Sequence, residues 1–384
     1  MPRKYKMQQD SWNIAINTRH WLPGKMEGFG RYIAEIASRL AQLLPSVQFY
    51  WLFDRKPSPQ IPDYANVKKI IIPPPARTIE LIKLWNDVAV PLTLKKIQAQ
   101  LYFSPDNHLS LSSNIPQVIT IHDINFIRYP KVLPPRTQRF LSKKTPLYLQ
   151  KAAHVITVSN FSKEEILSVF PNIPPEKISV IYNGVSSIFK PLDPKEIHQI
   201  RLQYSAGQPF FFVLGSLHER KNLRKTLEAF FIFKKNTQLP WYLIVTGRPL
   251  WKEFHIEIPS SLCSYVVFTG YLSDEMVAKL LGASHALLFC SLYEGFGLPL
   301  VEAFASEVPA ITSNTSALVE IGQEGALLVD PHNPHDIALA MQKLATDPLL
   351  YNELKQKTIK QAQLFSWDKA AKEIANIFLE ILTK

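Results

Sequence analysis

The sequence predicts an α/β protein made of two doubly wound domains, each a parallel sheet covered by helices. Three observations predict it. The 384 residues exceed what one hydrophobic core usually organises and suit two domains of about 150–200 residues. Short apolar runs alternate with longer amphipathic stretches, as in parallel sheets with helical crossovers. The alternation occurs in two successive series, which indicates two such domains.

The first series predicts six strands rich in β-branched, aromatic and aliphatic residues. They are residues 12–16, 49–53, 69–72, 101–103, 117–121 and 155–158. Helical periodicity is clearest in residues 31–44 and 162–169. The proline-rich residues 57–62 and 73–75 predict loops that leave strand ends.

The second series predicts strands at residues 210–214, 243–246, 266–269, 286–289, 310–312 and 326–328. Helices are predicted at residues 223–235, 274–281, 299–306 and 334–346, and a strongly amphipathic one at residues 367–382. Turn residues and weak periodicity at 183–194 predict the boundary. We therefore expect one domain in residues 1–185, a second in 186–365 and a separate terminal helix in 366–384.

Composition argues against several classes of protein. No run approaches the roughly 18–20 apolar residues of a spanning helix, and the first ten residues lack the apolar core of a signal peptide. Cys263 and Cys290 come from apolar segments without metal-ligand spacing, so we expect two buried thiols in a cytoplasmic protein. Residues 81–85, which include Trp85, either pack in the core, which we favour, or form an exposed apolar patch.

The net charge of +11 is unevenly distributed. Residues 1–185 hold 24 Lys and Arg against 12 Asp and Glu, a net +12, whereas the remainder is near neutral. This asymmetry predicts an anionic partner for the first half: a membrane surface, a pyrophosphate-bearing substrate or nucleic acid. Nucleic acid fits least, because no nucleic-acid-binding motif is present. Charge scattered for solubility is the alternative.

The strongest chemical signal is the segment 294–302, Glu-Gly-Phe-Gly-Leu-Pro-Leu-Val-Glu. It follows a predicted strand and opens a predicted helix. Its glycines allow close backbone approach to a ligand, and the N–H groups at the helix start form an anion site. Glu294 is expected at the loop tip and Glu302 about one turn into the helix, both facing the crevice beyond the strand ends. Carboxylates there suit sugar and ribose hydroxyls.

A basic pair, Arg220 and Lys221, lies between a predicted strand and a helix that starts near Asn222. Two cations at a helix N-terminus suit a nucleoside diphosphate, which gains charge as a glycosidic bond breaks. Gly215 precedes the pair. A surface basic pair without function is the alternative.

Two further segments carry candidate site residues. His122 and Asp123 end a predicted strand, where the histidine could hydrogen-bond a sugar hydroxyl. Gly28-Phe-Gly30 could be half of a dinucleotide fingerprint, but Ile33 replaces the third glycine and residues 18–27 are too long for its tight turn. We instead predict a flexible flap there, made basic by Arg19, His20 and Lys25.

The chain resembles the family 4 retaining glycosyltransferases of GT-B fold, whose hallmark is a segment like 294–302. Further matching blocks occur in the expected order at residues 28–32, 120–124, 155–163, 180–185, 215–222, 270–275, 313–320, 326–331 and 365–368. The resemblance covers nearly the whole chain. It implies two Rossmann-like domains facing a cleft, with the terminal helix crossing back onto the first domain.

The resemblance also implies transfer of a hexose from a nucleoside diphosphate sugar to a hydroxyl acceptor, with retention and without a cofactor or metal. His122 and Glu294 would be catalytic, and Glu302 would hold the ribose. The other implied donor-binding residues are Gly28, Gly30, Gly215, Ser216, Arg220, Lys221, Leu272, Phe296, Gly297 and Leu298. In the implied front-face mechanism, the departing diphosphate takes the acceptor proton. None of these residues identifies the base or the sugar of the donor.

The blocks most resemble bacterial mannosyltransferases of surface polysaccharide assembly, which implies GDP-mannose as donor and a glycan or lipid-linked acceptor. A UDP- or dTDP-sugar donor, or a non-catalytic nucleotide-sugar-binding relative, is the alternative. Two positions depart from the family pattern, since Glu307 replaces a usual glycine and Leu318 a frequent proline. Such proteins often work at the inner membrane face. The charge asymmetry then predicts peripheral contact with anionic lipid, without insertion, through Lys95, Lys96, Arg136, Arg139, Lys143 and Lys144.

Overall fold

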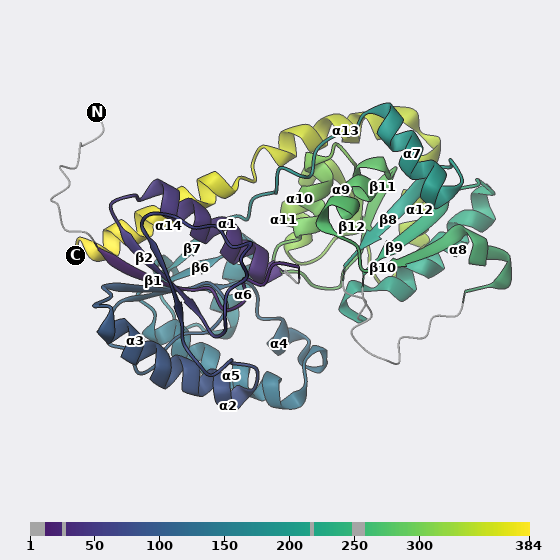
Figure 1. Cartoon of the computed structure of the whole chain (residues 1–384). Coiled ribbons are helices and arrows are strands. Elements are labelled where there is room, and N and C mark those ends of the chain that lie inside the picture. The colour runs from purple at the N-terminus through teal and green to yellow at the C-terminus, as the bar shows by residue number, and fades with distance from the viewer. Residues whose placement is uncertain (1–11, 25–27, 216–218, 248–257) are drawn as a thin grey trace, which may run out of the picture.

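The computed structural model describes residues 12–24, 28–215, 219–247 and 258–384. Within these residues the chain forms two parallel sheets, one in each of two lobes (Figure 1). The first sheet has the strand order β3-β2-β1-β4-β5-β6-β7, and the second has the order β10-β9-β8-β11-β12-β13. Each order reverses direction beside its first strand, as in doubly wound sheets. The predicted α/β class and paired sheets are confirmed.

The first sheet contains every strand predicted for the first half of the chain, with small shifts at the ends. Its strands are β1 Asn13–Asn17, β2 Gln48–Phe53, β3 Val67–Ile71, β4 Leu101–Ser104, β5 Gln117–Ile121, β6 His154–Thr157 and β7 Ile178–Val180. Strand β7 was not predicted, because three residues are too few to show a period. Along β1, Ile14 and Ile16 pack on one face of the sheet and Ala15 on the other.

Helices cover both faces of the first sheet (Figure 1). They are α1 Gly28–Leu43, α2 Ile79–Leu84, a π-helical turn at Trp85–Ala89, α3 Val90–Lys96, α4 Asn125–Arg128, α5 Pro135–Lys151 and α6 Asn160–Val169. Trp85 is fully buried and its indole N–H donates to the Ile72 carbonyl oxygen at 3.0 Å, so its predicted core packing is confirmed. Leu84, the preceding residue, is exposed, so only one of these two neighbours packs in the core.

The predicted flap, residues 18–27, is followed at once by helix α1, which begins at Gly28. Gly28 and Gly30 therefore form the first helical turn instead of a loop. Burial of Tyr32, Ile33 and Ile36 along one helix face draws this turn against the sheet. Lys25 lies outside the described residues.

The second sheet repeats the arrangement. Its strands are β8 Phe210–Leu214, β9 Tyr242–Thr246, β10 Val266–Gly270, β11 Ala286–Phe289, β12 Ala310–Ser313 and β13 Ala326–Val329. Its helices are α7 Pro194–Ser205, α8 Leu223–Thr237, α9 Asp274–Ala283, α10 Leu298–Ala305, α11 Ala317–Gly322, α12 Pro334–Thr346 and α13 Pro348–Ala362. Phe210 and Phe212 pack on one face of the sheet, whereas Phe211 and Val213 pack on the other.

The final helix, α14 (Trp367–Leu382), returns to the first lobe and lies beside α1 (Figure 1). Phe378 meets Phe103 of β4 with ring centroids 5.3 Å apart, and Asp368 accepts from Arg39 of α1 at 2.6 Å. Trp367 packs so closely on Gly184 that a β-carbon there would collide with its backbone. The chain between the sheets thus passes directly against the start of α14. Residue 185 remains our proposed domain limit.

The exposure of the two cysteines and the apolar character of the helices can be compared with the sequence predictions. Cys290 is buried as predicted, but Cys263 is exposed in a 3-10 turn at Ser260–Tyr265, so its predicted burial is wrong. Val266 begins β10 and packs in the core, whereas Cys263 stays in the preceding turn. In the described parts of the chain, no helix has both the length and the apolar character needed to cross a membrane.

Candidate active site

Glu294 lies at the loop after β11 and holds both cations of the basic pair. Its carboxylate is 2.8 Å from Arg220 Nη1 and 2.7 Å from Lys221 Nζ. Burial acts to raise the pKa of Glu294, but Arg220 and Lys221 outweigh it and lower that pKa to about 2. Burial lowers the pKa of Lys221, whose ammonium also lies 4.7 Å from the Phe289 ring centroid. The three groups form one buried, net cationic cluster.

The backbone around this cluster depends on two glycines in left-handed conformations. Gly215 after β8 has φ 137° and lies under the Lys221 side chain, and Gly297 before α10 has φ 112°. A β-carbon at Gly297 would lie 2.9 Å from a methyl of Leu318. The leucine at the position where proline is frequent therefore packs directly against the loop that follows Glu294.

Glu302 lies inside α10, just beyond the first turn, and is buried. Its carboxylate accepts from Nη1 of Arg31 in α1, and Nη2 of Arg31 lies 3.0 Å from Asp274 of α9. Burial raises the pKa of Glu302 to about 7, which Arg31 opposes and Asp274 reinforces. The second glutamate of the segment is thus tied to the first lobe.

His122 and Asp123 follow β5 on the opposite wall. The His122 ring lies edge-on to Phe29 and Tyr32, with centroids 4.8 and 4.7 Å away, and its Nε2 is 2.9 Å from the Pro105 carbonyl oxygen. Burial lowers the pKa of His122 to about 4, so the ring is neutral and Nε2 donates to Pro105. Burial raises the pKa of Asp123 despite the nearby charge of Arg220.

The two walls touch at Gly295. Ser159 and Ser162 at the start of α6 donate to its carbonyl oxygen at 2.6 and 3.1 Å. A β-carbon at Gly295 would collide with the His122 carbonyl oxygen. Glu320 of α11 also accepts from the backbone N–H groups of residues 160 and 161, at 2.9 and 3.0 Å. The loops beyond the carboxyl ends of both sheets therefore meet here, and they bring predicted residues of both halves together.

Comparison with known proteins agrees with this arrangement. The family model "Glycosyl transferases group 1" matches residues 195–364, and the model "Glycosyltransferase Family 4" matches residues 26–187. The chain is a glycosyltransferase. O-antigen chain mannosyltransferase B of Escherichia coli is 26% identical to it over 367 residues, which are 92% of this chain and 96% of that protein.

Solved structures show that this glycosyltransferase has the GT-B fold. Sucrose-phosphate synthase of Thermosynechococcus elongatus aligns with a TM-score of 0.75 at 19% identity, covering 97% of this chain and 99% of that one. The Anabaena protein HepE in complex with UDP-glucose aligns with a TM-score of 0.75 at 19% identity, covering 96% and 99%.

The other predicted site residues of the glycosyltransferase differ in burial and in position. Phe296 is buried, Leu298 begins α10, and Leu272 is half-buried after β10. Ser216 lies outside the described residues. Glu307 adopts φ 56°, so the turn keeps the left-handed conformation that a glycine prefers, and Lys355 lies 3.6 Å from its carboxylate.

The prediction that Arg19 makes the flap basic is wrong, because Arg19 is buried and paired with Asp106 at 2.6 Å. Sequence reasoning also missed Arg31 and Glu320 as contacts across the cleft. Arg31 stands inside the block at residues 28–32, but nothing local reveals a partner 271 positions away. Within the described ranges, no group of three His, Cys, Asp or Glu side chains is placed to hold a metal ion.

Proposed function

We propose that this protein transfers a hexose from a nucleoside diphosphate sugar to a hydroxyl acceptor, with retention at the anomeric carbon. The observation that carries the proposal is the buried cluster of Glu294, Arg220 and Lys221. Arg220 and Lys221 place two buried cations side by side, and an anionic ligand could share them with Glu294. His122 and Asp123 form the facing wall, so a sugar attached to that anion would lie between the lobes.

Each residue has a proposed part in donor binding. Arg220 and Lys221 stabilise the departing diphosphate, and Glu302 accepts hydrogen bonds from the ribose hydroxyls. Glu294 and the backbone N–H groups of residues 296–298 hold the sugar, with His122 at one of its hydroxyls. Backbone at Gly28, Gly30, Gly215, Ser216 and Leu272 completes the proposed donor site. Gly297 sets the loop geometry.

The departing diphosphate oxygen takes the proton of the attacking hydroxyl on the same face of the sugar. This front-face reaction needs neither a separate protein base nor a bound metal, because the two buried cations balance the charge that develops on the phosphate. In the donor-free protein Glu294 neutralises part of that charge. A diphosphate then shares the two cations with Glu294.

GDP-mannose is the proposed donor and bacterial surface polysaccharide the proposed product, as in lipopolysaccharide or O-antigen synthesis. The name of the Escherichia coli relative, an O-antigen chain mannosyltransferase, supports mannose as the transferred sugar and such a polysaccharide as the product. The UDP-glucose bound to the structurally similar Anabaena protein makes a UDP-sugar the rival donor. A binding protein without turnover is the rival function.

We further propose a cytoplasmic enzyme in peripheral contact with anionic membrane at α3 and α5, where it meets a lipid-linked acceptor. Lys95 and Lys96 end α3, and the four other predicted basic residues lie on α5. The structure adds Leu84, Val88 and Leu92, which are 44%, 47% and 64% exposed at four-residue spacing along one helical stretch. Such a stripe favours shallow contact of apolar side chains with the lipid, in addition to the attraction between basic residues and anionic lipid. The sequence predicted only the charge-based contact, without insertion.

A thermal-shift panel of nucleotide sugars tests donor binding, because a ligand that binds the native state alone raises the melting temperature. GDP-mannose is expected to give the largest rise, followed by GDP. A larger rise with UDP-glucose would reassign the donor. Binding without nucleotide release in the presence of simple sugar acceptors would favour the non-catalytic function.

A further inference from the structure

A second polar cluster lies where the first sheet reverses its winding. The chain leaves β1 toward β2 and leaves β4 toward β5 on the other side, so the crevice between β1 and β4 is the switch point. Asn17 Nδ2 donates to Ser104 Oγ at 3.1 Å and joins the two strand ends. Ligands of open α/β sheets bind at such a crevice. Apart from Gly28 and Gly30, which follow β1, the proposed donor residues lie beyond other strands.

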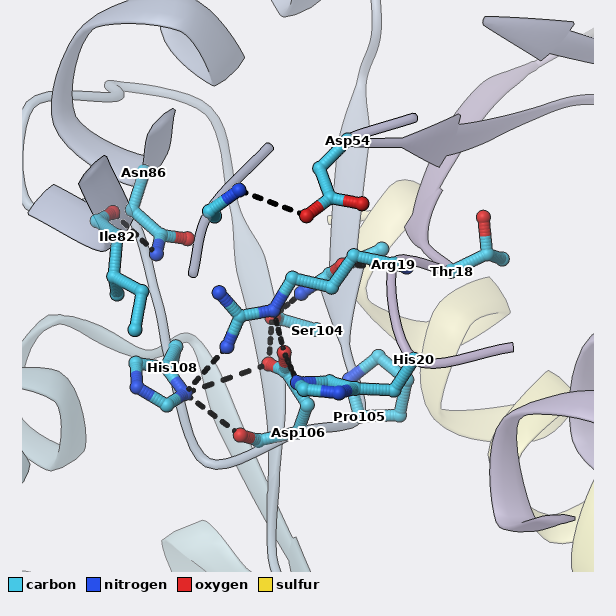
Figure 2. Close-up of polar contacts among 12 residues, drawn as sticks. Thr18, Arg19, His20, Asp54, Ile82, Asn86, Ser104, Pro105, Asp106 and His108 are labelled. Atoms are coloured by element: carbon cyan, nitrogen blue, oxygen red, sulfur yellow. Dashed lines mark hydrogen bonds and ion pairs between the residues drawn. The ribbon is translucent and has the colours of Figure 1, made fainter. Parts of the chain in front are cut away.

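Asp106 is the centre of this cluster (Figure 2). Its fully buried carboxylate lies 2.6 Å from Arg19 Nε, 3.1 Å from Ser104 Oγ and 3.4 Å from His20 Nε2. Burial acts to raise the pKa of Asp106, but Arg19 outweighs it and the pKa lies well below its usual range. Asp106 is therefore a fixed anion against which the neighbouring rings are oriented.

His20 is the member of this group that reaches the surface. Its side chain is 42% exposed, whereas those of Arg19 and Asp106 are buried. Its Nε2 faces the Asp106 carboxylate at 3.4 Å, which leaves Nδ1 as the ring nitrogen available to a ligand hydroxyl. Among the described residues, no group bonds this Nδ1.

The exposed ring of His20 lies beside the candidate active site. It is 6.0 Å from the Phe29 ring centroid, and Phe29 in turn lies 4.8 Å from His122. The loop that carries His20 also reaches the second lobe, where Tyr271 donates to the Gly24 carbonyl oxygen at 3.4 Å. A ligand bound by His20 would therefore approach the cleft from the first-lobe side, with the half-buried Phe29 ring between the two histidines.

We propose that His20, oriented by Asp106, binds a hydroxyl of the acceptor next to the one that attacks, with Phe29 as the adjoining wall. The inference rests on the proposed transferase function and names the acceptor subsite of the same cleft. The attacking hydroxyl stays free to pass its proton to the leaving diphosphate, because His20 holds its neighbour. His20 is thus an acceptor-binding residue and Asp106 a positioning residue. The ligand class is a sugar or other polyol.

The test separates acceptor use from donor chemistry. GDP-mannose is supplied with water as the acceptor, and then with methyl α-D-mannopyranoside as the probe. His20→Ala is expected to keep hydrolysis within about two-fold of wild type and to raise the KM for the probe about ten-fold, the scale of one lost hydrogen bond. His198→Ala, an exposed histidine on α7, is the matched control and should leave both reactions unchanged.

Asp106→Asn tests the positioning role, although it leaves the buried Arg19 without its carboxylate partner and is expected to lower the melting temperature. If Asp106 acts through His20, the substitution raises the probe KM in the wild type but adds nothing in His20→Ala, whereas a purely structural role would add its loss in both backgrounds. An unchanged probe KM in His20→Ala, or an equal fall in hydrolysis and transfer, would overturn the proposal.

Titration of [15N]histidine-labelled protein with methyl α-D-mannopyranoside gives a readout that needs no donor. A saturable shift of the His20 imidazole resonances, absent from His198, supports the subsite. Shifts elsewhere with His20 unmoved overturn it. Failure of every nucleotide sugar to bind or react would instead reject the proposed function, and the titration would still decide the sugar site.

Discussion

Arg31 at the start of the first helix donates a hydrogen bond to Glu302 in the opposite lobe. The contact makes the second glutamate of the segment a member of both lobes. It also sets the electrostatic state of that carboxylate, because Arg31 is the cation that opposes the effect of burial. Donor binding at Glu302 should therefore respond to changes on either side of the cleft.

Replacing Glu302 should weaken donor binding. Glu302→Ala is expected to lose about 1.5–3 kcal/mol of GDP-mannose binding free energy, the range for hydrogen bonds to a charged acceptor. Isothermal titration calorimetry measures it. Glu324→Ala, an exposed glutamate after α11, is the control. An unchanged Kd for Glu302→Ala would remove this residue from the donor site.

Replacing Glu294 should affect turnover more than binding. Glu294→Ala removes the carboxylate that orients both cations and, by our proposal, one sugar contact. The Kd for GDP-mannose should change less than kcat. Calorimetry and a nucleotide-release assay on the same preparation separate the two. Equal losses in both would assign Glu294 to uniform ground-state binding.

The basic pair should matter most to the leaving group. Arg220→Ala and Lys221→Ala are each expected to lower kcat by about 10²–10³, the scale of one lost electrostatic stabiliser. Binding of GDP should weaken more than binding of guanosine, because the pair addresses the diphosphate. Lys225→Ala, a nearby surface lysine in α8, serves as the control. Equal weakening of GDP and guanosine would argue against diphosphate contact.

Donor affinity should rise with pH near neutrality. Burial raises the pKa of Glu302 to about 7, and the ionised carboxylate is the form that accepts ribose hydroxyls. GDP-mannose affinity should therefore increase about ten-fold from pH 6 to pH 8 and level off above. Glu302→Gln should flatten the profile. Arg31→Ala should move its midpoint upward, because loss of the cation lets burial raise the pKa further. A midpoint unmoved by Arg31→Ala would contradict this assignment.

Membrane contact should depend on charge. Wild-type protein is expected to sediment with anionic vesicles and not with neutral ones, and high salt should release it, since screening acts within about 10 Å. Exchange of the six basic residues of α3 and α5 for glutamine should abolish binding, at about 1 kcal/mol for each lysine or arginine. Exchange of the exposed Lys195, Lys235 and Lys279 of the second lobe, set against exchange of three of the six, is the charge-matched control.

The apolar stripe gives a second arm to that experiment. The combined variant Leu84→Ser, Val88→Ser and Leu92→Ser should weaken vesicle binding at moderate salt without affecting donor hydrolysis. If wild-type protein stays in the supernatant at low salt, the membrane proposal is rejected and a soluble acceptor becomes the better hypothesis.

The two series of strands and helices, the segment 294–302 and the basic pair can be predicted from the amino-acid sequence, because these are local signals. Periodicity, turn residues and motif spacing all act over a few positions. Tertiary structure alone decided which partners the charged groups take. Arg31 meets Glu302, and Glu294 pairs with both Arg220 and Lys221. Buried Arg19 pairs with Asp106, whereas its sequence context predicts a basic flap. Such pairings, like the exposure of Leu84 beside buried Trp85, follow from how two parallel sheets pack and face each other. Local sequence patterns cannot predict these contacts, because the paired residues are far apart in the sequence.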